Sequence, residues 1–375
     1  MTRRPPSYFY TFAFRLIFAI KRIDVMDYPQ YDNVRSLRAM ELSSMLPDLS
    51  IASQEALRVV VAVDGETVFD EKLFPLGANV VLRALRDLVE PYAYERQTVT
   101  LTVTATTAGG QQKLSSQSTV VYCEADFGEE TAANYLSNHF LSILQGPKLT
   151  AMGRLELLPV QGNELATCVA RYSDGTTASF SVPTYLAPTN GRQFTEFDAS
   201  PSHFTTTGKT LTGYTITVGS RTQEYLIDLS APDCAPILIF YNSFGVEEVV
   251  YCTGTHRVDP NYKRSTAYIG HYQRNYKIDE TRAFKADTGP LTTAMANWLD
   301  DLFRSKCVRV ANLYDGTVVP GKEVLITDSK SSYSNDDAEL PRFTFTYQYA
   351  QRNHNVVQLE RAGRIFDNTF DNTFN

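Results

Sequence analysis

The chain has very little tryptophan and cysteine. Trp298 is the only tryptophan among 375 residues, and the five cysteines never form a Cys-x-x-Cys pair. This spacing excludes the usual zinc-ribbon and redox motifs, so we expect all the thiols to stay reduced. Those cysteines are Cys123, Cys168, Cys234, Cys252 and Cys307. No Asn-x-Ser/Thr acceptor is present either, which counts against a secretory route.

Motifs for common catalytic chemistry are also missing. There is no Gly-x-Ser-x-Gly, His-Glu-x-x-His or Gly-x-Gly-x-x-Gly segment. Gly208-Lys209-Thr210 is similar to the end of a phosphate-binding loop, but His203 stands where that motif needs glycine. The five histidines are far apart in the sequence. We therefore predict a protein that is not an enzyme and has no catalytic, cofactor-binding or metal site.

Whether one acidic segment binds calcium is left undecided by the sequence. Residues 328–340 carry oxygen ligands at Asp328, Asn335, Asp336 and Glu339 but lack the Asp-x-Asp-x-Asp-Gly register of a calcium loop. The pattern favours a solvated loop.

The charge and hydropathy patterns argue against nucleic acid and membrane partners. The net charge is −7, whereas a surface that binds nucleic acid needs a basic stripe. An apolar stretch at 8–20 is shorter than the ~20 residues that cross a bilayer. Its aromatic and aliphatic residues alternate, so we predict a long first strand there.

What the sequence does contain is a repeated hairpin pattern. At 59–69, 168–182 and 308–326, two alternating apolar runs flank an Asp-Gly pair. Asp-Gly tolerates the positive φ angles of tight hairpin turns, and alternation places apolar side chains on one face of a strand. The fold class predicted from this pattern is mainly β, with tandem immunoglobulin-like β-sandwich domains and a few short helices.

Composition and periodicity suggest where the domains end. We predict an N-terminal β-sandwich at 1–125, a helical junction at 126–147, a second β-sandwich at 148–255, a C-terminal β domain at 256–360 and a tail at 361–375. The predicted helices are one starting at Asn79 and ending before Pro91, one over 129–144 and one over 290–303 with Thr288 near its N-cap.

Two polar segments are candidates for contacts between subunits. Residues 186–208 are rich in Pro, Thr, Ser and Gly and predict a long exposed loop. The tail repeats Asp-Asn-Thr-Phe in tandem, and its spaced rings could dock on a partner. The candidate contact residues are Phe194, Phe197, Phe204, Phe366, Phe370 and Phe374.

Four segments together, 63–69, 240–255, 298–316 and 326–357, resemble structural proteins encoded in the tail modules of phages and prophages of gut bacteria. The resemblance implies a non-enzymatic virion protein of the tail, tail tip or baseplate, assembled in the bacterial cytoplasm. Its expected partners are further copies of itself, forming a ring, and other tail proteins. It implies no catalytic residue.

Two other functions remain open. A β-sandwich can bind carbohydrates or receptors through exposed tyrosines, although tryptophan, the best stacking ring, is scarce. A hydrolase would need one cleft in which distant carboxylates converge.

Overall fold

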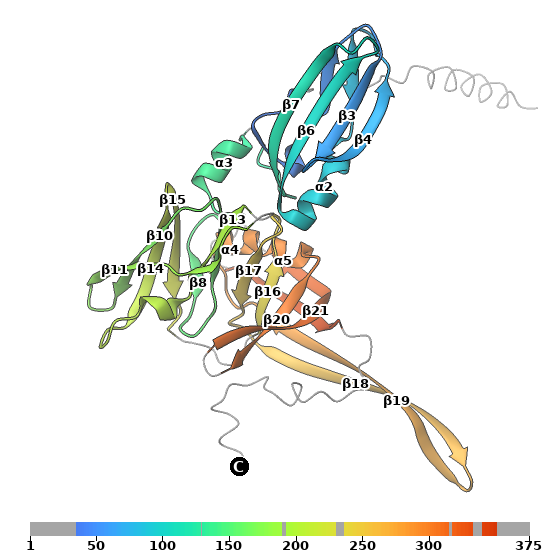
Figure 1. Cartoon of the computed structure of the whole chain (residues 1–375). Helices are drawn as coiled ribbons and strands as arrows, with labels where there is room; N and C mark the ends of the chain where they lie inside the picture. The colour runs from blue at the N-terminus through green and yellow to red at the C-terminus, as the bar shows by residue number, and fades with distance from the viewer. Residues whose placement is uncertain are drawn as a thin grey trace, which may run out of the picture.

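The computed structural model describes residues 35–128, 130–189, 193–229, 236–314, 317–332 and 340–350. Several β-sheets with a few short helices make up three units (Figure 1). The predicted fold class, mainly β with sandwich-type packing, is confirmed.

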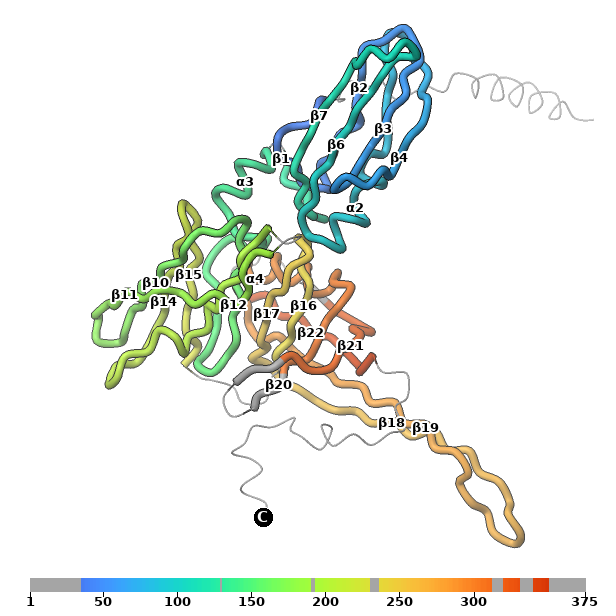
Figure 2. Tube along the Cα trace, viewed as in Figure 1, coloured from blue at the N-terminus to red at the C-terminus, as the bar shows by residue number. Residues whose placement is uncertain are grey.

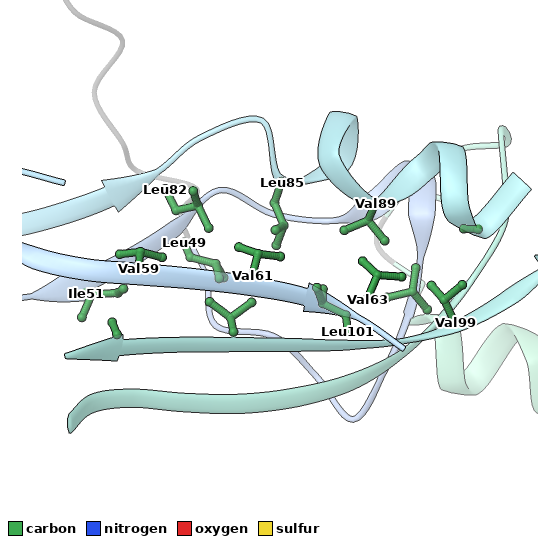
Figure 3. Close-up of a cluster of buried hydrophobic side chains, with 14 of the residues drawn as sticks. Leu49, Ile51, Val59, Val61, Val63, Leu82, Leu85, Val89, Val99 and Leu101 are labelled. Atoms are coloured by element: carbon green, nitrogen blue, oxygen red, sulfur yellow. The ribbon is translucent and has the colours of Figure 1, made fainter. Parts of the chain in front are cut away.

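The N-terminal unit packs a five-stranded sheet against a smaller layer. In sheet order, the large sheet contains β1 (Met40–Leu42), β7 (Gln112–Val121), β6 (Thr98–Thr107), β3 (Leu57–Val63) and β4 (Glu66–Leu73). The smaller layer contains β2 (Leu49–Ala52), β5 (Asn79–Leu82) and helix α2 (Leu85–Arg96), and the turn η1 (Ser43–Met45) follows β1. Aliphatic side chains of both layers meet in one core (Figure 3).

The first Asp-Gly hairpin forms as predicted. Asp64 and Gly65 have φ values of 49° and 85°, and β3 pairs antiparallel with β4 on either side of them. Val59, Val61 and Val63 alternate into the core, where Figure 3 shows them facing Leu82, Leu85 and Val89. The period of two along β3 therefore buries one face of the strand.

The predicted helix at Asn79 is wrong at both ends. Residues 79–82 form strand β5, and the helix begins only at Leu85. Pro91 lies inside α2 rather than beyond it. Proline removes one backbone donor from a helix, but packing of Leu85, Val89 and Ala93 on the sheet keeps α2 continuous to Arg96.

The middle unit is a sandwich of five and three strands. The larger sheet runs β11 (Thr177–Ser181), β10 (Ala166–Tyr172), β14 (Leu211–Val218), β15 (Arg221–Ile227) and β8 (Lys148–Thr150). The smaller runs β12 (Thr184–Leu186), β13 (Phe194–Asp198) and β9 (Leu157–Gln161). β10 and β11 form the second predicted Asp-Gly hairpin.

The prediction of an exposed loop over 186–208 is wrong for most of its described residues. Strand β13 pairs with both β9 and β12, and the turn η2 (Pro201–Phe204) follows it. Phe194, Phe197 and Phe204 are buried. The polar composition of the segment concealed a strand whose few aromatic residues complete the chain's own core.

The third unit contains one seven-stranded sheet. Its order is β17 (Glu247–Tyr251), β16 (Ile237–Tyr241), β20 (Val308–Tyr314), β21 (Thr317–Ser332), β22 (Arg342–Tyr349), β19 (Tyr272–Asp287) and β18 (His256–Ile269). The predicted boundary after residue 255 is therefore wrong for β16 and β17, because β16 pairs with β20. The third Asp-Gly hairpin is confirmed by pairing of Tyr314 with Thr317.

Two consecutive helices cover this sheet where a single one over 290–303 was predicted. They are α4 (Thr293–Trp298) and α5 (Asp300–Arg304). The N-cap is Thr292, not Thr288, and its hydroxyl accepts a hydrogen bond from the Met295 amide. The predicted apolar stripe is buried against the sheet, with Trp298 and Leu302 fully enclosed.

Apolar contacts join the three units. Helix α3 (Ala132–Asn138), shorter than predicted because His139 is extended, brings Tyr135 against Phe244 of the third unit. The same cluster includes Val121 of the N-terminal unit. A separate cluster joins Leu157 on β9 to Ile239 on β16. The units thus form a continuous body, from which β18 and β19 project (Figure 2).

Several predictions lie outside the described residues. These are the first strand at 8–20, the contact residues Phe366, Phe370 and Phe374, and most of the acidic loop at 328–340. Among the described residues, no helix is long and apolar enough to cross a membrane. Cys123, Cys168, Cys252 and Cys307 are unpaired thiols.

Candidate functional site

A cleft of about 950 Å³ lies where the three units meet. The end of α2 contributes residues 94–97, β12 and β13 contribute residues from the middle unit, and β16, β17 and β20 contribute residues from the third. Clefts between domains are common places for ligands, because side chains from separate elements converge there. Tyrosines, charged side chains and one glutamine dominate its walls.

Three tyrosines line the cleft, one from each unit. Tyr94 lies in the last turn of α2, Tyr185 on β12 and Tyr241 on β16. Tyr94 and Tyr185 are 43% and 45% exposed, so much of each ring is accessible to a ligand. Lys306 Nζ lies 4.8 Å from the centroid of the Tyr94 ring and helps to hold the ring in place.

The hydroxyls of Tyr185 and Tyr241 stay protonated at neutral pH. Burial, followed by the negative charge of Glu247 and a hydrogen bond to it, raises the pKa of Tyr241 to about 12. Burial and the nearby Glu247 and Glu196 also raise the pKa of Tyr185. Both phenols therefore remain neutral donors and acceptors.

Charged groups in the cleft are mostly paired. Arg309 donates to Glu247 across β20 and β17, and Arg96 Nη1 lies 2.8 Å from Asp64 Oδ2. Glu247 faces the cleft while its neighbour Glu248 is buried on the other side of β17, as alternation along a strand requires. Because the lining combines carboxylates with guanidinium groups, it does not present a strong field of one sign.

Gln97 carries the most unusual geometry in the cleft. Its φ is 65° and its ψ −41°, a region that residues other than glycine rarely adopt. The side chain is only 5% exposed, its Oε1 accepts from the Thr98 hydroxyl, and its Nε2 has no hydrogen-bond partner in the described part of the chain. That nitrogen is itself buried, so a polar ligand in the cleft would reach it only after the side chain turns outward.

These groups suit recognition of a polar ligand with apolar faces. Tyrosine rings offer flat apolar surface, and phenol, amide and guanidinium groups offer hydrogen bonds. The described residues contain no group of three or more His, Cys, Asp or Glu that could hold a metal ion.

The sequence-based candidates contribute little to this cleft. Phe194 reaches its wall, whereas Phe197 and Phe204 belong to the core of the middle unit. In this fold the three rings are not presented at the surface. Sequence reasoning missed the tyrosines, Gln97 and Arg309, because they are far apart along the chain and share no motif.

Comparisons with known proteins identify no family. No family model matches the chain, and no curated protein matches it. Among solved structures, the chain is similar to SGBP-B of the Bacteroides ovatus mixed-linkage glucan utilization locus, in complex with a mixed-linkage heptasaccharide. The identity is 12%, the match covers 83% of this chain and 73% of that one, and the TM-score is 0.15. A likeness at that TM-score carries no argument about function.

Proposed function

We propose that this protein is a non-catalytic binding module that holds a saccharide in the cleft between its three units. The observation that carries the proposal is that Tyr94, Tyr185 and Tyr241, one from each unit, line the same cleft. Sugar rings combine C–H faces with dense hydroxyl groups, which match tyrosine faces and the phenol and charged groups that line the cleft. The paired charges favour a neutral saccharide over a phosphorylated ligand.

A glycan array, followed by calorimetric titration of the best oligosaccharide, tests this proposal. Replacing Tyr94 and Tyr185 together by alanine should weaken binding about tenfold or more, because two partly exposed rings lose their contact with the sugar. Tyr268→Ala, which removes a tyrosine that is 78% exposed but distant from the cleft lining, is the matched control and should bind normally.

Absence of binding to every glycan on the array would refute the saccharide proposal. Release of shorter saccharides during incubation would contradict its non-catalytic part and favour a hydrolase instead.

A second candidate function is a structural subunit of a phage-type tail. The observation that favours it is the long ribbon of β18 and β19, which projects from the body and exposes aromatic side chains. The resemblance of several segments to tail-module proteins points the same way. Electron microscopy of the purified protein would test it. Rings or filaments are expected, and a field of single monomers would count against it.

A further inference from the structure

Strands β18 and β19 form an arm that leaves the seven-stranded sheet. β19 pairs with β22 only over Phe284–Asp287. Between Asp259 and Ala283 the two strands pair with each other and with no third strand of the described chain. At about 3.3 Å per residue, β18 spans about 35 Å from Asp259 to Ile269. Figures 1 and 2 show the arm pointing away from the body.

The outer part of the arm exposes large apolar side chains on both strands. They are Tyr262, Tyr268, Ile269, Tyr272, Tyr276 and Ile278, with exposed fractions from 41% to 78%. Register places Ser265 opposite Lys277 and Thr266 opposite Asn275, so Tyr276 is the extra residue of a β-bulge. A bulge changes the direction in which side chains point, and here it adds the ring of Tyr276 to the exposed apolar side chains.

The same stretch is strongly basic. Residues 261–278 carry Lys263, Arg264, Arg274 and Lys277 and no carboxylate. Lys277 pairs with Asp279 at 2.9 Å, whereas the other three form no ion pair with the described residues. Since the whole chain has a net charge of −7 and these 18 residues contribute +4, the rest of the chain carries −11.

Protection of a sheet edge does not account for this surface. Lysines and a proline such as Pro260 do prevent unwanted pairing of edge strands. Exposed tyrosines and isoleucines have the opposite effect, because they favour association. A two-stranded ribbon is also marginally stable in water without further packing. The arm therefore has the properties of a segment that is completed by a partner.

We propose that the arm docks on the body of a second copy of this chain. Pairing of two arms would bring the unpaired cations of both together, whereas the body of another copy offers an excess of negative charge. The contact is then heterologous, with the arm of one copy on the body of the next. Repeated contacts of this kind close into a ring or continue as a filament.

The free edge of the N-terminal unit has the features that the arm requires. β4 is the outermost strand of its sheet, Glu66 and Glu71 on it are exposed, and Phe74 and Leu76 just beyond it are 71% and 52% exposed. A groove of about 530 Å³ lies across β4, β3 and β6 at the same end of the unit, and Glu71 belongs to its lining. The edge and the arm lie at opposite ends of the molecule, as a head-to-tail contact needs (Figure 1).

Sedimentation velocity over a range of concentration and salt tests the self-association. The unmodified protein should form oligomers that weaken as salt rises. Tyr268→Ser with Tyr272→Ser, and separately Lys263→Glu with Arg264→Glu, should raise the concentration needed for assembly by at least about tenfold. Leu165→Ser, at a 90% exposed site outside the arm, is the matched control and should assemble normally. An unmodified protein that stays monomeric at every concentration would overturn the proposal.

Mixing two variants tests the direction of the contact. The first carries Lys263→Glu and Arg264→Glu, and the second carries Glu66→Gln and Glu71→Gln. Each alone should remain monomeric, but the mixture should give a one-to-one complex, because one intact arm meets one intact edge. If the mixture stays monomeric while both variants keep normal thermal unfolding, the head-to-tail contact with β4 is wrong. None of these residues lines the cleft, so saccharide binding should be unchanged in every variant. Failure of the saccharide proposal can therefore be told apart from failure of the docking proposal.

Discussion

Lys148 Nζ lies 2.6 Å from Glu156 Oε2 inside the protein, where the side chains are only 4% and 2% exposed. The same ammonium donates to the Val249 carbonyl oxygen at 2.7 Å and lies 4.6 Å from the centroid of the Trp298 ring. Lys148 belongs to the middle unit and Trp298 to the third, so this buried cation joins the two units whose strands supply much of the cleft.

Removing the cation should destabilise the fold strongly. Burial already raises the pKa of Glu156, and without Lys148 its carboxyl group would be left in the interior with no opposite charge beside it. Lys148→Met is expected to lower the free energy of unfolding by about 3–5 kcal/mol. Chemical denaturation measures this change. The double variant with Glu156→Leu should recover part of the loss, and an equal loss in both variants would contradict the charge argument.

A glycine of the third unit lies close to Tyr122 of the N-terminal unit. Gly245 has a φ of 67°, and a Cβ atom placed there would lie 2.9 Å from Cδ1 of Tyr122. Gly245→Ala should cost more stability than Gly153→Ala, where φ is 75° but nothing lies within 4 Å of an added Cβ. Gly153→Ala measures the cost of a positive φ at alanine, about 1 kcal/mol. The additional loss of stability in Gly245→Ala measures the close contact with Tyr122. Equal losses in denaturation would show that Tyr122 moves aside freely.

His256 at the base of the arm should make stability depend on pH. Its ring stacks with Phe284 and Tyr347, and burial lowers its pKa below the ordinary 6.5. In the unfolded chain the ring binds a proton near pH 6.5, whereas in the folded chain it resists one. Its contribution to stability is therefore present above pH 6.5 and is lost as pH falls through the folded-state pKa.

The test is to measure the unfolding free energy of the original protein and of His256→Gln, each at pH 7.5 and at pH 5. The glutamine side chain does not titrate. The loss of stability on acidification should be smaller in the variant, because the other titrating groups are common to both proteins. An identical loss would rule out His256 as a source.

Local patterns predicted the strands better than their assembly. The Asp-Gly pair at Asp64 and the stripe containing Trp298 correctly indicated a hairpin and a buried helical face, since both depend on neighbours in the sequence. Membership of β16 in the third sheet depends on pairing with β20, about 70 residues later, and no local pattern encodes that distance. The prediction that the helix ends before Pro91 was wrong for a similar reason. Packing of α2 on the sheet outweighs the tendency of proline to end a helix.

The candidate site was less predictable than the fold. Tyr94, Tyr185 and Tyr241 are ordinary strand and helix residues until three units bring them to one cleft. The arm was missed too, although residues 261–278 combine four cations with exposed tyrosines and no carboxylate. The run of cations and tyrosines without a carboxylate is visible in the sequence, and it is the signal that could have found the arm.

Gln97 offers a test that separates binding from stability. A positive φ at a residue other than glycine costs of order 1–3 kcal/mol, and such strain commonly persists where a side chain serves a ligand. Gln97→Gly removes the strain and the unpaired amide together, although it also removes the bond from Thr98. The variant should therefore unfold within about 1 kcal/mol of the original protein but bind the saccharide at least about tenfold more weakly. Denaturation and calorimetric titration on the same samples give both quantities. Unchanged affinity would show that the strained conformation serves only the turn from α2 into β6.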